Sequence, residues 1–243
     1  MLRKKKTVPL PALGAKADPK IEFFMAASHQ LKSPVAIIQW CLQSILEMPV
    51  LPPEVKKLTE KSLAQADGMS HLLSDMLNVF RAIHGGGFQH DLVPVDMNII
   101  LESVFAEYQP RAEQRQIYLL KGPIEKLPPV HADATLLKQA LINIVDNAIK
   151  YSTDRGRVEI GARVHNNQAE VTVSDHGIGI PEIDQDRLFT EFFRAQNAKD
   201  KTDEGTGLGL VLVKHIMESF GGSVSVQSAV GKGSRVMLII PLA

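Results

Sequence analysis

The chain has 243 residues, and its 27 lysines and arginines balance 27 aspartates and glutamates, so the formal net charge is zero. A hydrophobic content of 44% excludes an intrinsically disordered protein and fits one large domain or two smaller ones. The lack of a basic excess argues against nucleic acid as a partner. The single cysteine, Cys41, excludes an intrachain disulfide framework and fits a reducing compartment.

The sequence predicts no membrane-spanning helix, because it contains no run of about 18 apolar residues. Its basic opening, Met1–Lys6, has no apolar segment behind it and so does not resemble a signal peptide. A tag remnant, a flexible end and the cytoplasmic flank of a transmembrane segment all remain compatible with this opening. We expect residues 1–17 to be a flexible lead-in.

Two long helices are predicted next, over Pro19–Glu47 and from Pro53 to Ile83, with a proline-rich break between them. Apolar residues recur at alternating spacings of three and four, which is the seam of a helical bundle. The expected seam comprises Phe24, Ser28, Leu31, Val35, Ile38, Leu42 and Ile45 on the first helix, and Val55, Leu58, Ser62, Gln65, Met69, Leu72, Met76, Val79 and Ile83 on the second. A hairpin this long cannot bury its apolar faces alone, so residues 18–84 predict a homodimeric four-helix bundle.

His29 lies one position past a seam residue, so we expect its side chain beside the bundle, in water. Pro34 removes its own N–H and crowds the carbonyl of Gln30, which predicts a bend just after the histidine. An exposed histidine on a bendable helix is a candidate nucleophile, and an ordinary surface histidine is the alternative.

Gly85–Gly87 marks a domain boundary, after which the pattern becomes mixed helix and strand. The expected strands are Leu92–Val95, Ile117–Leu120, a short piece at Pro128–Val130, Arg157–Val164, Glu170–Ser174, Ser223–Gln227 and Arg235–Ile240. The expected helices run from Asp96 to about Gln114, from Asp133 with an apolar face through Ala148, and from about Leu208 to Phe220. A glycine-rich, charged segment spans roughly 176–205. This order predicts helices on one face of a largely antiparallel sheet.

The first chemical motif of this region, Asn143–Ser152, places Asn143 and Asn147 on one helix face. Two amides on a face that otherwise meets the core need partners, which a hydrated Mg²⁺ would supply; a polar helix edge is the alternative. Lys150 adds a cation for phosphate, and Tyr151 adds a ring near the helix end.

The second motif, Asp175–Pro181, directly follows a predicted strand. Asp175 can accept a hydrogen bond from an exocyclic amine such as that of adenine. Gly177 and Gly179 let the backbone lie close against a flat ligand. An ordinary turn after a strand is the alternative.

The third motif, Gly205–Leu210, opens a helix, and N–H groups at a helix N-terminus suit phosphate. Its glycine spacing is neither the dinucleotide fingerprint nor a P-loop, which disfavours both of those folds. The fourth motif, Leu188–Arg194, contains three phenylalanines that can anchor a mobile lid, with Arg194 reaching a phosphate. Core packing of the rings and a solvated arginine are the alternative.

Each motif is ambiguous alone, but their order along the chain is specific. Ser-His-Gln-Leu-Lys-Ser-Pro, Asn-x-x-x-Asn-Ala-x-Lys-Tyr-Ser, Asp-x-Gly-Ile-Gly-Ile-Pro, Phe-Phe-Arg and Gly-Thr-Gly-Leu-Gly-Leu together resemble the catalytic core of two-component sensor histidine kinases. Gly231–Ser234 is similar to the last glycine box of that family. The resemblance covers about residues 18–243. It implies a dimerisation and phosphotransfer hairpin (18–84), a hinge (85–91) and a Bergerat-type (GHKL) ATP-binding domain (92–243).

The resemblance implies an ATP-dependent protein-histidine kinase that uses ATP and Mg²⁺ and passes its phosphoryl group to an aspartate of a response regulator docked low on the hairpin. It also implies a homodimer and a cytoplasmic location, either free or as the cytoplasmic portion of a membrane-anchored sensor. His29 would be the phosphoacceptor and Asn147 an Mg²⁺ ligand, with Asn143 beside the metal.

The remaining implied roles concern the nucleotide. Lys150 and Arg194 would contact phosphates, Tyr151 would pack near the adenine, and Asp175 would bind its amino group. The residues expected to line the nucleotide and its lid are Gly177, Ile178, Gly179, Gly205, Thr206, Gly207, Leu208 and Gly209.

The chain departs from the family pattern beside the phosphoacceptor. Gln30 stands where the family most often has an acid, and Ser33 stands where it usually has Thr or Asn. A carboxylate can take the imidazole proton, whereas an amide can only orient the ring. The acid and the Thr also position water for dephosphorylation of the regulator, so a phosphatase activity is in doubt.

Two other functions compete with the kinase. A nucleotide-binding signalling scaffold that transmits helix movement without phosphorylating itself would explain Gln30. An anti-sigma-type serine kinase shares the ATP-binding fold, but such proteins lack a hairpin that carries a histidine.

Overall fold

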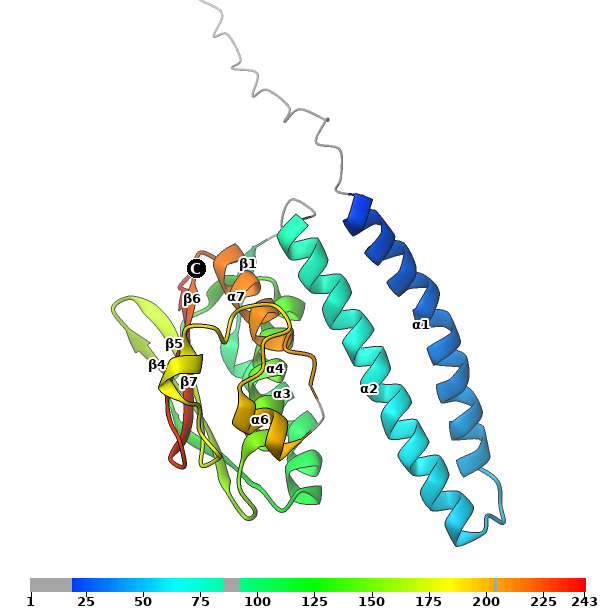
Figure 1. Ribbon diagram of the computed structural model, residues 1–243. Helices are drawn as coiled ribbons and strands as arrows, with labels where there is room; N and C mark the ends of the chain where they lie inside the picture. The colour runs from blue at the N-terminus through cyan, green and yellow to red at the C-terminus, as the bar shows by residue number, and fades with distance from the viewer. Residues whose placement is uncertain (1–18, 85–91, 203–204) are drawn as a thin grey trace, which may run out of the picture.

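Figure 1 shows the computed structural model, in which two long helices lie beside a domain of β-strands and the helices that cover them. The structure describes residues 19–84, 92–202 and 205–243. The expected lead-in and hinge lie outside the described residues. So do the side chains of residues 19–29, including that of His29, and those of residues 71, 75 and 78–84. The expected seam residues Phe24, Ser28, Val79 and Ile83 are among these side chains.

The hairpin consists of α1 (Pro19–Leu46) and α2 (Pro53–His84), which pack against each other. Pro53 opens α2, where a missing N–H is harmless, and Glu54 complements the helix dipole in the first turn. The helical hairpin expected from the sequence is confirmed. The predicted bend does not interrupt α1, which continues through Pro34 as one helix.

The face of α2 that packs on α1 is displaced by one residue from the expected seam. Expected seam residues Leu58 and Met69 are 65% and 55% exposed. Among the described side chains of α2, the buried ones are instead Thr59, Ala66, Leu73 and Leu77. A helix in a four-helix bundle contacts two neighbours, so its apolar stripe is wider than one neighbour can cover. Within a single chain, α1 therefore covers only one edge of the apolar stripe of α2.

The second domain carries a five-stranded sheet of order β2-β4-β5-β7-β6. Its strands are β2 (Tyr118–Ile124), β4 (Arg157–His165), β5 (Gln168–Asp175), β6 (Ser223–Ala229) and β7 (Gly233–Pro241). β2 pairs with β4 in parallel, and the other pairs are antiparallel. A small antiparallel sheet joins β1 (Val93–Val95) to β3 (Val130–Ala132). The predicted mixed sheet is confirmed.

Three helices cover one face of the sheet in Figure 1: α3 (Met97–Gln114), α4 (Ala134–Tyr151) and α7 (Gly209–Ser219). The predicted starts of two of them are confirmed, because the side chains of Asp96 and Asp133 accept hydrogen bonds from N–H groups in the first turns of α3 and α4. The apolar faces of these helices and of the inner sheet form the core. α7 also packs against α2, so the hairpin touches this domain there.

The glycine-rich segment over 176–205 contains two short helices that the sequence analysis did not anticipate. These are α5 (Glu182–Gln185) and α6 (Gln196–Lys201). Helices this short carry too little periodicity to be recognised from sequence. They lie on either side of the Phe-Phe-Arg motif.

Candidate nucleotide and phosphotransfer site

The end of α4 is fastened to the loop that follows β5. The N–H of Ile178 donates to the carbonyl of Tyr151 at 3.1 Å, and Ser152 forms a β-bridge with Gly177. A Cβ at Gly177 would overlap the Tyr151 carbonyl oxygen, so only glycine permits this approach. Two motifs separated by more than twenty residues thus form one continuous wall.

Asp175 is the last residue of β5 and its carboxylate lies in this wall. Its Oδ1 accepts hydrogen bonds from the N–H groups of Gly177 at 2.8 Å and Ser234 at 3.2 Å. Burial raises the pKa of Asp175 to about 6, because desolvation of the carboxylate outweighs these two donors. Among the described residues both bonds go to Oδ1, which leaves Oδ2 to accept from a ligand.

The turn between β6 and β7 packs against the loop that follows β5. Gly179 has φ +64°, and a Cβ there would overlap the carbonyl of Ala229. The N–H of Gly231 donates to the carbonyl of Ile178 at 2.9 Å, and the Ser228 hydroxyl accepts from the N–H of Ile180 at 2.9 Å. The backbone that would face a flat ligand is therefore held rigidly.

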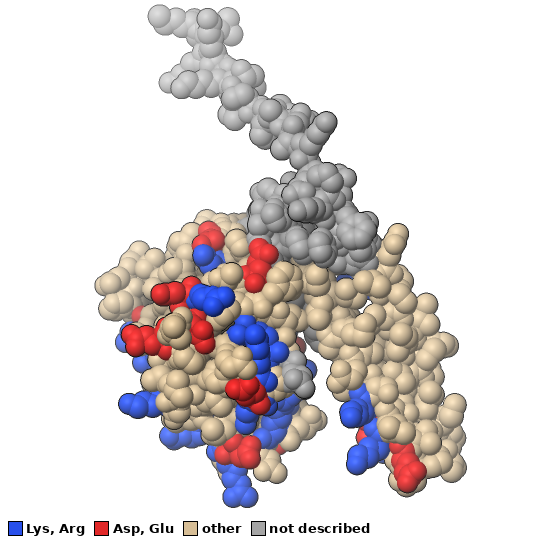
Figure 2. Space-filling view, in the orientation of Figure 1, with Lys and Arg blue, Asp and Glu red and all other residues tan. Residues whose placement is uncertain are grey.

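Two expected phosphate contacts lie together beside the glycine motif. A Cβ built on Gly205 would lie 2.5 Å from Lys150 Nζ, 3.6 Å from Tyr151 Oη and 3.8 Å from Arg194 Nε. Lys150 Nζ is 5.1 Å from the centroid of the Tyr151 ring. Figure 2 shows basic side chains gathered over the part of this domain that carries α6, with acidic side chains among them. Two cations at one end of the wall favour an anionic ligand group there.

The N-terminus of α7 lies between the glycine motif and α4. Among the described residues no side chain caps this helix; the Thr206 hydroxyl accepts from the N–H of Leu208 just before it. A Cβ at Gly209 would lie 3.4 Å from Asn143 Oδ1, so the helix start approaches α4 closely. Uncapped N–H groups and the positive end of the helix dipole suit phosphate oxygens.

Asn143 carries a buried amide nitrogen that has no hydrogen-bond partner among the described residues. Native structures rarely leave such groups unsatisfied, so the nitrogen fits a ligand that brings its own acceptor. Asn147 lies one turn further along the same face of α4. The described part of the chain holds no cluster of three or more His, Cys, Asp or Glu suited to a metal. A metal held mainly by a ligand's phosphates needs no such cluster.

Gly207 and Arg194 connect the Phe-Phe-Arg motif to the rest of the site. A Cβ at Gly207, whose φ is +73°, would lie 2.6 Å from the backbone carbon of Phe192. Arg194 Nη2 donates to the carbonyls of Ala198 at 3.1 Å and Thr202 at 2.6 Å. The guanidinium therefore joins the glycine motif to the end of α6.

The histidine-bearing motif lies apart from these residues, on α1. Gln30 and Ser33 are both exposed. The helical period places Ser33 on the side of α1 away from the buried Val35. Trp40 lies on the same side and is 68% exposed.

Family models match both parts of the chain. Residues 20–85 match the His Kinase A (phospho-acceptor) domain. Residues 132–243 match the histidine kinase-, DNA gyrase B- and HSP90-like ATPase. The chain is a sensor histidine kinase catalytic core. The resemblance in the sequence is thereby confirmed, and the helical hairpin and mixed-sheet ATPase domain are the two parts of this kinase core.

Curated relatives and solved structures agree with this identification. The kinase core is 32% identical over 220 residues to sensor-like histidine kinase SenX3 of Mycolicibacterium smegmatis, covering 90% of this chain and 57% of SenX3. It is similar to full-length ShkA in complex with AMPPNP, with 25% identity and a TM-score of 0.71 over 91% of this chain and 46% of ShkA. It is also similar to the histidine kinase AdeS of Acinetobacter baumannii, with 26% identity and a TM-score of 0.63 over 88% of this chain and 98% of that one.

The chain spans 53–57% of the length of the SenX3 proteins it matches. None of the helices in the described ranges is long and apolar enough to cross a membrane.

Several residues of the site carried no signal in the sequence. Ser228 and Gln185 hold the backbone around Ile180. Asn197 bonds the carbonyl of Gly179. None of the three belongs to a motif, and only the tertiary fold brings them to the glycine loop. Ser234 belongs to the last glycine box, but its contact with Asp175 has no signal in the sequence.

Proposed function

We propose that the kinase core binds ATP with Mg²⁺ between α4 and α7 and transfers the γ-phosphoryl group to Nε2 of His29. The bond from phosphorus to the ADP oxygen breaks, the phosphorus–nitrogen bond forms, and ADP leaves. The nucleotide domain would be residues 92–243 and the acceptor domain residues 18–84, joined by residues 85–91. The observation that carries this proposal is the grouping of Lys150 and Arg194 around Gly205 at the uncapped start of α7.

Positioning and charge neutralisation would supply most of the catalysis, as in other phosphoryl transfers. Lys150 and Arg194 would neutralise phosphate charge, and Asn147 would hold Mg²⁺, with Asn143 beside it. The metal would supply further neutralisation of the phosphates. Asp175 Oδ2 would accept from the adenine amino group, and the Tyr151 ring would pack near the base.

Incubation with γ-labelled ATP tests the proposal directly. Phosphohistidine is labile to acid and stable to base, whereas phosphoserine shows the opposite pattern. We expect acid-labile label on the chain that depends on Mg²⁺. An absence of label from a protein that binds ATP would contradict the kinase and favour the signalling scaffold, whose support is the neutral Gln30.

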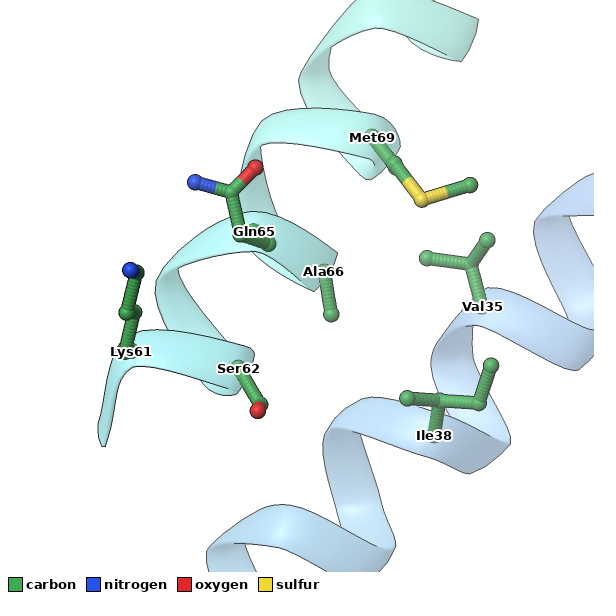
Figure 3. Close-up of a pocket in the computed structure, with 7 residues that line it drawn as sticks. All are labelled: Val35, Ile38, Lys61, Ser62, Gln65, Ala66 and Met69. Carbon is green, nitrogen blue, oxygen red and sulfur yellow. The ribbon is translucent and has the colours of Figure 1, made fainter. Parts of the chain in front are cut away.

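We further propose that two copies pair through the hairpin. The hollow between α1 and α2 measures about 310 Å³, and Figure 3 shows Val35, Ile38 and Met69 converging on it while Lys61 turns away. Ile38, which lines the hollow, is 50% exposed, and Leu58, an expected seam residue of α2, is 65% exposed. Apolar side chains this exposed on a long hairpin fit a second copy that completes the bundle.

Light scattering after size exclusion checks this pairing. Leu58→Glu places a charge on the expected interface and should shift the protein from dimer to monomer. Val164→Glu offers a matched control, since Val164 is a partly exposed apolar residue on β4, far from the hairpin in sequence. Equal dimer fractions for both variants would contradict the proposed interface.

A response-regulator receiver domain is the proposed recipient of the phosphoryl group. Its aspartate must reach His29, so the regulator must cover the side of α1 that His29 shares with Trp40 and Ile37. These two residues are 68% and 62% exposed on the side away from the seam. Trp40→Ala should therefore slow transfer to the regulator and leave autophosphorylation unchanged, whereas equal transfer rates would place the regulator elsewhere. We propose that this exchange takes place in the cytoplasm.

A further inference from the structure

Helix α6 connects the two ends of the candidate nucleotide site. Asn197, in its first turn, reaches the loop beneath the expected adenine position. The carbonyls of Ala198, within the helix, and of Thr202, just beyond it, both receive Arg194. α6 therefore stands between the base side and the phosphate side.

The contact on the base side is a hydrogen bond from Asn197 Nδ2 to the carbonyl oxygen of Gly179 at 2.8 Å. Two contacts restrict the movement of Gly179. Its backbone packs so closely on that of Ala229 that a Cβ would not fit, and the carbonyl of the preceding residue, Ile178, accepts from the N–H of Gly231. Asn197 thus ties α6 to one of the most firmly held points of the site.

The contact on the phosphate side depends on α6. Arg194 Nη2 lies 3.1 Å from the carbonyl of Ala198, the residue that follows Asn197, and 2.6 Å from that of Thr202. Both bonds come from the same nitrogen, and hydrogen bonds from a charged group are short and directional, so a displacement of these two carbonyls would pull on the guanidinium. A shift of α6 would therefore carry the guanidinium away from Gly205 and Lys150.

The amide of Asn197 is only half satisfied. Its Oδ1 is buried and has no hydrogen-bond partner within the described residues, while its nitrogen donates to Gly179. An unsatisfied buried group in a native structure calls for an explanation, and here the acceptor is left unpaired while the donor keeps its bond. The contribution of Asn197 to the site is therefore the hydrogen bond that it donates to Gly179.

We propose that Asn197 is a positioning residue for phosphoryl transfer, which holds α6 and, through α6, fixes Arg194 over the phosphates. The proposal rests on the proposed kinase function and adds a residue that touches neither the nucleotide nor His29. Asn197 acts on the reaction only through Arg194. Loss of the bond therefore affects the phosphate end of the site and spares the base end.

A double-mutant cycle tests this chain of contacts. Asn197→Asp keeps the size of the side chain and removes the donor, and Asn197→Ala removes the whole amide. Each should raise the dissociation constant for ATP and lower the maximal autophosphorylation rate by about 3- to 10-fold, the range expected for one lost hydrogen bond. In an Arg194→Ala background, either substitution should change these values less than about 2-fold.

Gln196→Ala is the matched control. Gln196 lies in the same helix and donates to Asp200 at 2.8 Å, a bond that stays within α6. This variant should keep the wild-type affinity and rate. An equal effect of Gln196→Ala and Asn197→Ala would show general loosening of the helix and overturn the proposal.

Two further results would overturn it. One is a wild-type rate and ATP affinity in Asn197→Asp. The other is an equal loss from Asn197→Asp in the presence and absence of Arg194, which would make the effects additive. ATP affinity, measured by competition with a fluorescent analogue, decides the coupling even if no phosphate is incorporated. A lack of phosphate on the wild type would contradict the kinase function separately.

Discussion

Asp175 accepts a hydrogen bond from the N–H of Ser234, a residue 59 positions later in the chain, at 3.2 Å. Gly233, just before Ser234, has φ +84° and lies so close that a Cβ would overlap the Asp175 carbonyl oxygen. The start of β7 therefore positions the carboxylate that we assign to adenine. This relationship explains why a glycine box lies at the end of the sequence, far from the other motifs.

The raised pKa of Asp175 predicts that ATP affinity falls as the pH is lowered through about 6. The ionised carboxylate would accept from the adenine amine at Oδ2, and a proton on Oδ2 would remove that acceptor. Below the pKa the loss should approach about tenfold per pH unit. The measurement is the ratio of ATP dissociation constants for wild type and Asp175→Asn from pH 5 to 8, in which titration of ATP itself cancels. A ratio that stays constant would contradict the assignment.

The same group makes a stability prediction for the nucleotide-free protein. The pKa in the folded state, about 6, lies above the ordinary aspartate pKa of 3.8, so folding favours the protonated form. The stabilising contribution is full below pH 4 and is lost as the pH rises through 6. Asp175→Asn should therefore raise the free energy of unfolding at pH 7 and have little effect at pH 4. Urea denaturation at the two pH values checks this, and an equal change at both would show that burial is not the cause.

Gly233→Ala and Gly231→Ala form a matched pair at the turn between β6 and β7. Both glycines have positive φ, at 84° and 73°, so each substitution adds backbone strain of about 1–3 kcal/mol. Only at Gly233 would the new Cβ meet Asp175; at Gly231 it would meet open space. Gly233→Ala should destabilise the domain more and weaken ATP binding, whereas Gly231→Ala should retain affinity. Equal ATP affinities in the two variants would show that this turn does not affect nucleotide binding.

Asn147→Ala should weaken ATP binding only when Mg²⁺ is present. Losing a metal ligand or its support typically lowers affinity by about 10- to 100-fold. Asp146→Ala is the control, because Asp146 faces away and pairs with Arg111 at 3.3 Å. Titrations with Mg²⁺ and with EDTA give the comparison. Unchanged affinity of Asn147→Ala in Mg²⁺ would place the metal ligand elsewhere.

The architecture could be predicted from the sequence because its signals are local. Helix caps at Asp96 and Asp133, alternating strands and glycine breaks are each encoded within a few residues. The displaced face of α2 could not be predicted, since Thr59 and Leu58 differ by one position and only packing selects between them. When the apolar stripe of a helix is wide enough to contact two other helices, the sequence does not indicate which edge of the stripe packs against which helix.

The sequence predicts the motif residues of the site, but it does not predict the residues that hold the backbone of the site in place. Asp175 and the glycines stand out because their chemistry or conformation is unusual. Asn197, Gln185 and Ser228 are ordinary polar residues, and their roles come from contacts across long sequence separations. No spacing rule reaches such contacts.

Gln30→Glu should raise the rate of autophosphorylation at neutral pH. A carboxylate beside the imidazole can take the proton released as the phosphorus–nitrogen bond forms, whereas the amide can only orient the ring. Well-placed general bases contribute about 10²–10⁴-fold, and an exposed site such as that of Gln30 should lie at the low end. Initial rates at saturating ATP and several pH values provide the test. An equal or lower rate at every pH would show that proton transfer does not limit the step.

We propose above all that His29 receives the γ-phosphoryl group of ATP bound in the separate nucleotide domain. The decisive measurement is the incorporation of acid-labile phosphate from γ-labelled ATP into wild type and His29→Ala, with ATP affinity measured for both. We expect label on the wild type alone and dissociation constants within a few-fold of each other, because nucleophile and pocket lie on different domains. Acid-labile phosphate on His29→Ala would contradict it.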